Sequence, residues 1–180
     1  MRSWITFFSM TGSKIYNVSR KLRRKPDVIV TNKTSLEGIV PELLSLVDSN
    51  RIVMIPNRPS VDEYEIAIND IVKISKNPLI TLHGFLRVVP PEICEKYDII
   101  NCHPGLITEY PELKGKDPQK RAVDYPVIGT VLHRVTAGVD EGPVVASDSC
   151  DNLYRSVDSV TCKLKHMSEK LWIDLLHKLL

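Results

Sequence analysis

Short apolar runs alternate with segments of helical periodicity along the first hundred residues of the chain. The runs at residues 4–9, 27–31, 51–55, 79–82 and 98–101 are rich in β-branched and aromatic side chains, which is typical of buried strands. Between them, apolar residues recur every three or four positions and predict helices. Strands and helices that alternate in this way form a mostly parallel sheet with helices on both faces. We therefore expect an α/β, Rossmann-like fold.

Residues with clear positional preferences mark where the predicted helices begin. Ser13 is expected to cap the first helix, and Pro41 suits the first turn of a second helix that reaches Val47. The segment Ser60-Val-Asp-Glu63 resembles a capping box and predicts a third helix that continues to Ile74. Each of these helices carries an apolar face that can pack on the sheet.

The pattern changes in the second half of the chain. A short helix is expected at residues 91–97. Residues 127–136 and 143–149 resemble two strands with no helix between them, and an amphipathic helix follows from about Val157. Consecutive strands that are joined without a crossover helix pair in an antiparallel sense. We expect the 180 residues to form a single domain whose sheet ends in an antiparallel strand pair.

Composition and charge narrow the class of protein. With 43% hydrophobic residues, 26% charged residues and a formal net charge of +2, the chain resembles an average globular domain, not a nucleic-acid-binding or membrane-surface protein. The basic run at residues 20–25 suits the solvated last turn of the first helix, where cations interact favourably with the helix dipole. Four scattered cysteines lack the spacing of a zinc site, which predicts reduced thiols and no metal. No apolar stretch reaches membrane-spanning length, so we expect a soluble, cytoplasmic protein.

Ligands of such sheets bind outside the carboxyl ends of the strands, and one candidate there is Met10-Thr-Gly-Ser-Lys14. Gly12 lets the backbone approach a ligand, and the helix that follows offers unpaired N–H groups and the positive end of its dipole to a phosphate. The segment lacks the spacing of a P-loop and the three glycines of a dinucleotide fingerprint. Taken alone, a turn, a helix cap and a solvated lysine explain it equally well.

A second candidate is Ile99-Ile-Asn-Cys-His-Pro-Gly105 at the end of the fifth predicted strand. Asn101 and His103 are two residues apart, so an extended backbone directs their side chains to the same face. A lone histidine at a strand end is usually structural, and a hairpin loop that carries Asp140 and Glu141 is equally ordinary. The combination of these segments is more specific for a function than either segment alone.

Four motifs in a fixed order make this combination specific. They are Asn-x-His-Pro-Gly-Leu from residue 101, Tyr-Pro-x-Leu from 110, Gly-Thr-x-x-His from 129 and Val-Asp-x-Gly-Pro-Val from 139. Together they resemble the folate-dependent formyltransferases, most closely the phosphoribosylglycinamide formyltransferases of purine biosynthesis. The stretch Leu-His-Gly-Phe-Leu-Arg-Val-Val from residue 82 is similar to the family's folate-pocket segment. The resemblance spans about residues 5–147.

The resemblance implies a reaction and a set of residue roles. A formyl group would pass from 10-formyltetrahydrofolate to the primary amine of a small phosphate-bearing substrate, with glycinamide ribonucleotide as the first candidate and no metal. Asn101 and a protonated His103 would donate hydrogen bonds to the developing oxyanion. Asp140 would favour the charged His103 and relay a proton, and His133 would support the site.

The resemblance also assigns the ligand-binding residues, with the substrate half at about residues 1–78 and the folate-binding and catalytic half at about 79–180. The implied phosphate-binding residues are Gly12, Ser13 and Lys14. The implied folate-binding residues are Leu86, Arg87, Val88, Val89, Thr136, Ala137, Gly138 and Val139.

Several departures from the family leave alternatives open. Met10 and Lys14 stand where glycine and asparagine are common in the family, and Ser168, or Glu169 beside it, stands where the family has an acid that contacts the substrate ribose. The basic segment 114–121 is either a solvated loop or an attraction for an anionic substrate. The alternatives are a formyltransferase for another nucleotide-like or sugar amine, a formyltetrahydrofolate hydrolase, or a non-catalytic relative. The chain is expected to be a monomer or a homodimer.

Overall fold

The protein is described here by a computed structural model covering residues 2–72, 77–154 and 156–180. The strands are β1 (Trp4–Phe8), β2 (Val28–Thr31), β3 (Ile52–Met54), β4 (Leu79–Leu82), β5 (Asp98–His103), β6 (Val127–Arg134) and β7 (Val144–Asp151). The helices are α1 (Ser13–Leu22), α2 (Pro41–Leu44), α3 (Val61–Val72), α4 (Pro91–Lys96), α5 (Pro118–Ala122) and α6 (Val157–Leu179), with short 3-10 turns η1 (Ser49–Arg51) and η2 (Pro111–Leu113). Within these ranges, no helix combines the length and apolarity needed to cross a membrane.

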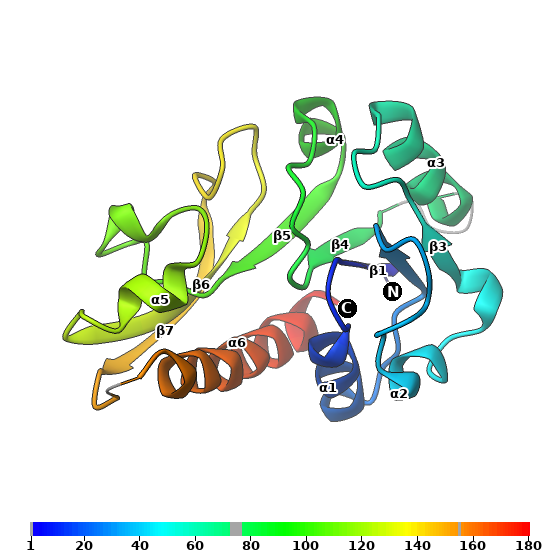
Figure 1. The fold of residues 1–180 in the computed structure, drawn as a ribbon. Coiled ribbons are helices and arrows are strands. Elements are labelled where there is room, and N and C mark those ends of the chain that lie inside the picture. The colour runs from blue at the N-terminus through cyan, green and yellow to red at the C-terminus, as the bar shows by residue number, and fades with distance from the viewer. Residues whose placement is uncertain (1, 73–76, 155) are drawn as a thin grey trace.

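The strands form one sheet in the order β3-β2-β1-β4-β5-β6-β7. The first five strands of this order run parallel to their neighbours, and β6 and β7 continue the sheet in antiparallel pairing. Both the mostly parallel sheet and its antiparallel end confirm the prediction from the alternating pattern. Figure 1 shows α3 and α4 on one side of the sheet and α1, α2 and α6 on the other.

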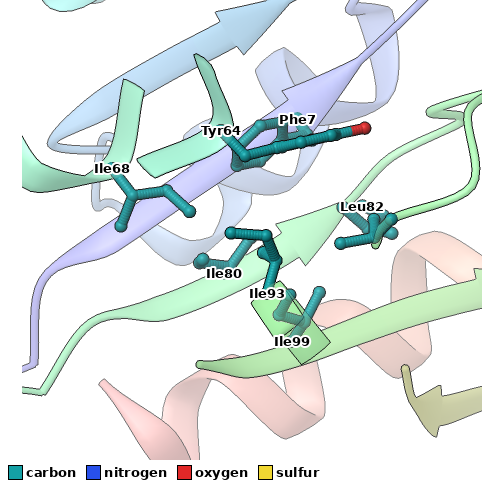
Figure 2. Close-up of a pocket in the computed structure, with 8 residues that line it drawn as sticks. Phe7, Tyr64, Ile68, Ile80, Leu82, Ile93 and Ile99 are labelled. Atoms are coloured by element: carbon teal, nitrogen blue, oxygen red, sulfur yellow. The ribbon is translucent and has the colours of Figure 1, made fainter. Parts of the chain in front are cut away.

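The face that carries α3 and α4 packs through side chains from alternate positions of β1, β2 and β4. Figure 2 shows the centre of this packing, a small pocket lined by Phe7, Tyr64, Ile68, Ile80, Leu82, Val89, Ile93 and Ile99. Nearly every side chain around it is apolar, and the Tyr64 hydroxyl donates outward to the Val88 carbonyl at 3.4 Å. Burial raises the pKa of Tyr64 to about 12. We interpret this pocket as part of the core.

The opposite face is covered by α1 and α6. Trp4, Leu79 and Ile100 from three strands pack against Val18 of α1 and Trp172 of α6. Because α6 is long, it also reaches β6, where a further cluster includes Leu113, Ile128 and Leu164. The helix therefore packs against both the parallel part of the sheet and its antiparallel end.

Several local predictions were wrong at the ends of elements. Ser13 does not cap α1, because it is the first helical residue and Gly12, with φ of 74°, occupies the cap position. The second helix ends at Leu44 and not at Val47, because the Leu46 N–H donates to the Leu43 carbonyl only three residues back, which is the bonding of a turn. β5 continues through His103, because that strand pairs with β6 up to Val131.

β6 ends at Arg134 and not at residue 136, and β7 continues to Asp151 and not only to residue 149. The starts of the third and the last helix agree with the sequence pattern. The capping box is formed, with the Glu63 carboxylate accepting from the Ser60 N–H at 2.7 Å and the Ser60 hydroxyl accepting from the Glu63 N–H at 3.3 Å. The predicted end of this helix at Ile74 lies outside the described residues. The C-terminal helix begins at Val157 as expected, with Ser156 as its cap.

The strand order predicts where a ligand would bind. Chain connections diverge on either side of β1 and β4, and in open α/β sheets a crevice forms at such a switch, beyond the carboxyl ends of the strands. The segments that follow β1, β4 and β5 all meet at this edge. These are the segments in which the sequence places its candidate chemistry.

Candidate active site

Adjacent strands bring Asn101, His103 and His133 together. Asn101 and His103 share a face of β5, and His133 is the cross-strand partner of Asn101 on β6. A bulge interrupts the pairing of β6 with β7 between Leu132 and His133, a feature that re-aims side chains and is common beside active sites. The side chains of Asn101 and His133 meet, with Nδ2 and Nε2 separated by 3.3 Å.

Asp140 joins this group from the loop between β6 and β7. Its Oδ2 lies 3.1 Å from His103 Nδ1, and its Oδ1 lies 3.4 Å from His133 Nε2. Only 9% of its side chain is exposed. Its backbone is left-handed, with φ of 54°, a conformation that costs energy for a residue with a Cβ. The structure thus brings the four predicted site residues into one cluster.

The charge of Asp140 is held by its neighbours. Burial by itself raises the pKa of a carboxyl group, but hydrogen bonds from His103 and His133, the nearby His103 charge and the Gly115 N–H outweigh it. The pKa of Asp140 is therefore held well below its ordinary value. Asp140 is an ionised acceptor throughout the neutral pH range.

His103 is fixed at both ring nitrogens. In addition to the Asp140 contact at Nδ1, its Nε2 lies 2.8 Å from the Leu113 carbonyl oxygen. Both partners are acceptors, so the ring makes both hydrogen bonds only when each nitrogen carries a proton. Leu113 is itself buried in the core. In this arrangement His103 therefore has no free N–H for the donation to a substrate oxygen that the resemblance had implied.

His133 has two alternative partners at one nitrogen. Its Nδ1 lies 3.0 Å from the Arg134 carbonyl, to which it donates. Its Nε2 can then accept from the Asn101 amide when the ring is neutral, or donate to Asp140 when the ring is protonated. Only one of these two hydrogen bonds forms at a time.

Two backbone groups in the site were missed by sequence reasoning. The Leu113 carbonyl contacts His103, and the Gly115 N–H donates to Asp140 Oδ2 at 3.0 Å. Both belong to the segment 111–117, part of which lies in the Tyr-Pro-x-Leu motif. That motif was a signal of family resemblance, but it does not reveal which backbone groups face the site.

The predicted phosphate turn lies two strands away from this cluster. β1 and β5 are separated by β4, which corresponds to about 10 Å between their ends. Gly12 has no side chain to cap α1, and the Thr11 and Ser13 hydroxyls lie 3.2 Å apart beside the first turn. The first turn of α1 contains no acidic residue. The turn can therefore present N–H groups and hydroxyls to an anion.

Gly12 is also required by packing. A Cβ at this position would lie 2.2 Å from Leu43 Cδ2, in addition to the strain of a positive φ. Leu43 is fully buried, so its side chain cannot move aside without leaving a gap in the core. We expect Gly12→Ala to lower the free energy of unfolding by about 2–4 kcal/mol, measured by urea denaturation.

Gly84→Ala is the matched control for this prediction. Gly84 has a similar φ of 71°, but a Cβ there would meet nothing within 4 Å. Its substitution carries the cost of the left-handed backbone alone, about 1–2 kcal/mol. Equal losses in the two variants would show that the Leu43 overlap is relieved at no cost.

The predicted folate segment follows β4. Four of its backbone groups already have partners: Leu86 N–H with the Ser9 hydroxyl, Leu86 O with Arg87, Val88 O with Tyr64, and Val89 O with Cys94. The Arg87 carbonyl and the N–H groups of residues 87–89 have no hydrogen-bond partner among the described residues. Leu86 and Val88 are 60% and 70% exposed. The segment thus offers polar backbone groups between apolar side chains.

The loop that carries Asp140 forms the other side of the cluster. The Thr136 hydroxyl donates to the Gly138 carbonyl at 3.5 Å, Ala137 is exposed, and Val139 has an exposed apolar side chain. Close packing fixes the base of the loop, because a Cβ on Gly142 would lie 1.8 Å from the Arg134 carbonyl. The loop is therefore anchored while its tip stays accessible.

Ser168 and Glu169 are both engaged within the protein. The Ser168 hydroxyl donates to the Lys165 carbonyl and is fully buried. The Glu169 carboxylate accepts from Asn17 at 2.8 Å and lies 3.5 Å from Lys21 Nζ. Neither side chain is left without a protein partner, so the structure assigns neither of them to a substrate.

Comparisons with known proteins identify the family of the chain. The model of the family described as Formyl transferase matches residues 5–176. Phosphoribosylglycinamide formyltransferase from Mycobacterium tuberculosis is 29% identical over 96 residues, which cover 52% of this chain and 44% of that protein. The enzyme of the same name from Bacillus subtilis is 25% identical over 120 residues, covering 65% and 61% of the two chains. The match thus spans less than two thirds of either curated relative.

Solved structures extend the likeness over the whole fold. The crystal structure of phosphoribosylglycinamide formyltransferase from Campylobacter jejuni superposes with a TM-score of 0.82 at 22% identity, covering 100% of this chain and 99% of that one. At this identity the likeness establishes the fold alone. The match of the family model to nearly the whole chain establishes more: the protein belongs to the formyl transferase family.

Proposed function

We propose that the protein transfers the formyl group of 10-formyltetrahydrofolate to the primary amine of a small phosphate-bearing substrate, with glycinamide ribonucleotide as the first candidate. The observation that carries this proposal is the cluster of Asn101, His103, His133 and Asp140 at the carboxyl edge of the sheet. It joins an amide donor to an ionised carboxylate. Attack of an amine on a formyl carbon requires both kinds of group.

Asn101 is the group that faces the developing charge. When the amine nitrogen bonds to the formyl carbon, the formyl oxygen becomes an oxyanion. The Asn101 amide has two hydrogens, and at most one of them points to His133. The other is free to donate to the oxyanion, an interaction that is stronger in the transition state than in the ground state.

Asp140 assists the transfer of a proton from the attacking amine to the departing folate nitrogen. The attacking amine must lose one proton, and the departing folate nitrogen must gain one when its bond to the formyl carbon breaks. The ionised carboxylate beside Asn101 can orient a water molecule that takes up the first proton and delivers it to the folate nitrogen. His103 donates to Asp140 from a fixed position, so it orients the carboxylate and places a positive charge near the oxyanion.

The surroundings of the cluster suit the two substrates. The segment 86–89 and the loop tip 136–139 offer backbone groups between exposed apolar side chains, which fits a flat pterin that also needs hydrogen bonds. The turn at Gly12, Ser13 and Lys14 lies about 10 Å away across two strand spacings. This separation suits a small molecule that carries a phosphate at one end and an amine at the other.

A spectrophotometric assay with 10-formyl-dideazafolate tests the proposal. Loss of the formyl group is followed with and without glycinamide ribonucleotide. We expect turnover that depends on the amine. Equal turnover without amine would identify a hydrolase instead, and turnover with only another phosphorylated amine would correct the substrate. Folate binding with no turnover toward any amine would favour a non-catalytic relative.

The phosphate turn makes a separate prediction. Ser13→Glu puts a negative charge in the first turn of α1, where a phosphate is proposed to bind. We expect the KM for the amine to rise roughly 10-fold or more, because like charges at this distance are costly, while folate affinity is unchanged. Ser13→Gln, of similar size and without charge, is the matched control. Equal loss of folate affinity would indicate a folding defect and contradict this role.

A further inference from the structure

Arg121 of α5 contacts four backbone carbonyl groups of the segment 112–116 through its guanidinium group. Nη1 donates to the Glu112 carbonyl, and Nη2 lies 3.2, 2.8 and 2.9 Å from the carbonyls of Leu113, Lys114 and Lys116. The planar guanidinium can serve several acceptors at once, which an ammonium group cannot do in the same geometry. Arg121 thereby gathers the segment 112–116 around one charge.

The same segment supplies both backbone contacts to the site. The Leu113 carbonyl accepts from Arg121 and also from His103 Nε2. The Gly115 N–H, between two carbonyls that Arg121 binds, donates to Asp140 Oδ2. At the rim, Lys114 Nζ lies 3.7 Å from Glu141 Oε1. Arg121 is thus linked to His103 through Leu113, and to Asp140 through the peptide group that joins Lys114 to Gly115.

Lys120 shows that this arrangement is not a general property of the basic segment. Lys120 precedes Arg121 on the same helix and carries the same charge. Its Nζ lies 3.6 Å from Asp117, and both side chains are largely exposed. Among the described residues, the Lys120 side chain makes no hydrogen bond or ion pair with Asn101, His103, His133 or Asp140. The two cations are therefore separable by experiment.

We propose that Arg121 is a positioning residue, which holds the Leu113 carbonyl and the Gly115 N–H so that His103 and Asp140 keep their relative orientation. The inference rests on the proposed function for its kinetic consequence. Positioning by Arg121 differs from an electrostatic attraction of the substrate by the segment 114–121. Attraction depends on charge alone, whereas positioning depends on the geometry of the guanidinium group.

Steady-state kinetics of Arg121→Ala, Arg121→Lys and Lys120→Ala distinguish the two roles. For positioning, kcat falls about 10- to 100-fold in both Arg121 variants, the KM for the amine changes little, and Lys120→Ala is unaffected. Added guanidinium ion restores part of the rate of Arg121→Ala. An increase in the amine KM that is similar in Arg121→Ala and Lys120→Ala, and absent in Arg121→Lys, would overturn the proposal.

Nitrogen-15 NMR of the histidine rings tests the inference without any turnover. Comparison with His103→Gln assigns the His103 signals. In the unaltered protein we expect both ring N–H protons of His103 to be protected from exchange, and in Arg121→Ala we expect faster exchange of the Nε2 proton, with Lys120→Ala unchanged. Unchanged His103 signals in a folded Arg121→Ala variant would refute positioning. If the unaltered protein lacked transfer activity, the proposed function would fail while this measurement still decided the role of Arg121.

Discussion

Asp140→Asn is expected to lower kcat/KM by roughly 10²–10⁴-fold, the range typical of a lost general base. The asparagine keeps the size of the side chain but removes the charge that faces His103 and His133 at 3.1 and 3.4 Å. It also leaves the two rings without their ionised acceptor. Steady-state rates with both substrates, and single-turnover rates at saturation, measure the loss.

Asp124→Asn is the matched control for this variant. Asp124 is exposed in the turn between α5 and β6, so its substitution removes the same charge from the chain without touching the cluster. We expect its rates to equal those of the unaltered protein. Circular dichroism and urea denaturation establish that Asp140→Asn is folded. Near-normal transfer by a folded Asp140→Asn protein would rule out a role of Asp140 in the proton transfer.

Asn101→Ala is expected to reduce kcat about 10²–10³-fold with little change in folate affinity. The substitution removes the one side-chain donor of the cluster that retains a free N–H, and the loss of a single oxyanion donor typically costs this much. Because the interaction exists chiefly in the transition state, KM should stay nearly constant. Stopped-flow measurement of the transfer step separates the chemical rate from product release.

Asn50→Ala serves as the comparison, since Asn50 is exposed in η1 at the far end of the sheet. A second comparison comes from within the site. Asn101→Asp keeps the size but replaces the donor with a negative charge beside Asp140, and it should be no more active than Asn101→Ala. A rise in the amine KM with unchanged kcat would instead mean that Asn101 binds the substrate and does not stabilise the oxyanion.

The architecture was predictable because it depends on periodicity, which is visible in the sequence. Buried parallel strands such as 28–31 and 79–82 are short runs dominated by Val, Ile and Leu, and the missing helix between β6 and β7 predicted the antiparallel end. The ends of elements were less predictable. The cap of α1 depends on the left-handed backbone of Gly12, and α2 ends early in a backbone turn at Leu43 and Leu46 that the apolar pattern does not indicate.

The side chains of the site could be predicted from the sequence, but its backbone groups could not. Asn101, His103, His133 and Asp140 stood out because their motifs occur in a fixed order, and strand pairing brings them together. The Leu113 carbonyl and the Gly115 N–H are backbone groups, which nearly all residue types have in common. No sequence pattern could therefore indicate them. The role of Arg121 was hidden for the same reason, since its partners are all carbonyl groups.

The measurement that tests the central claim most directly follows the fate of the formyl group. The protein is incubated with 10-formyltetrahydrofolate that is isotopically labelled in the formyl carbon and with glycinamide ribonucleotide, and mass spectrometry locates the label. The account predicts that the label appears in the formylated amine, and that Asp140→Asn slows its transfer by roughly 10²–10⁴-fold. Label that accumulates in free formate, at the same rate with and without the amine, would contradict it.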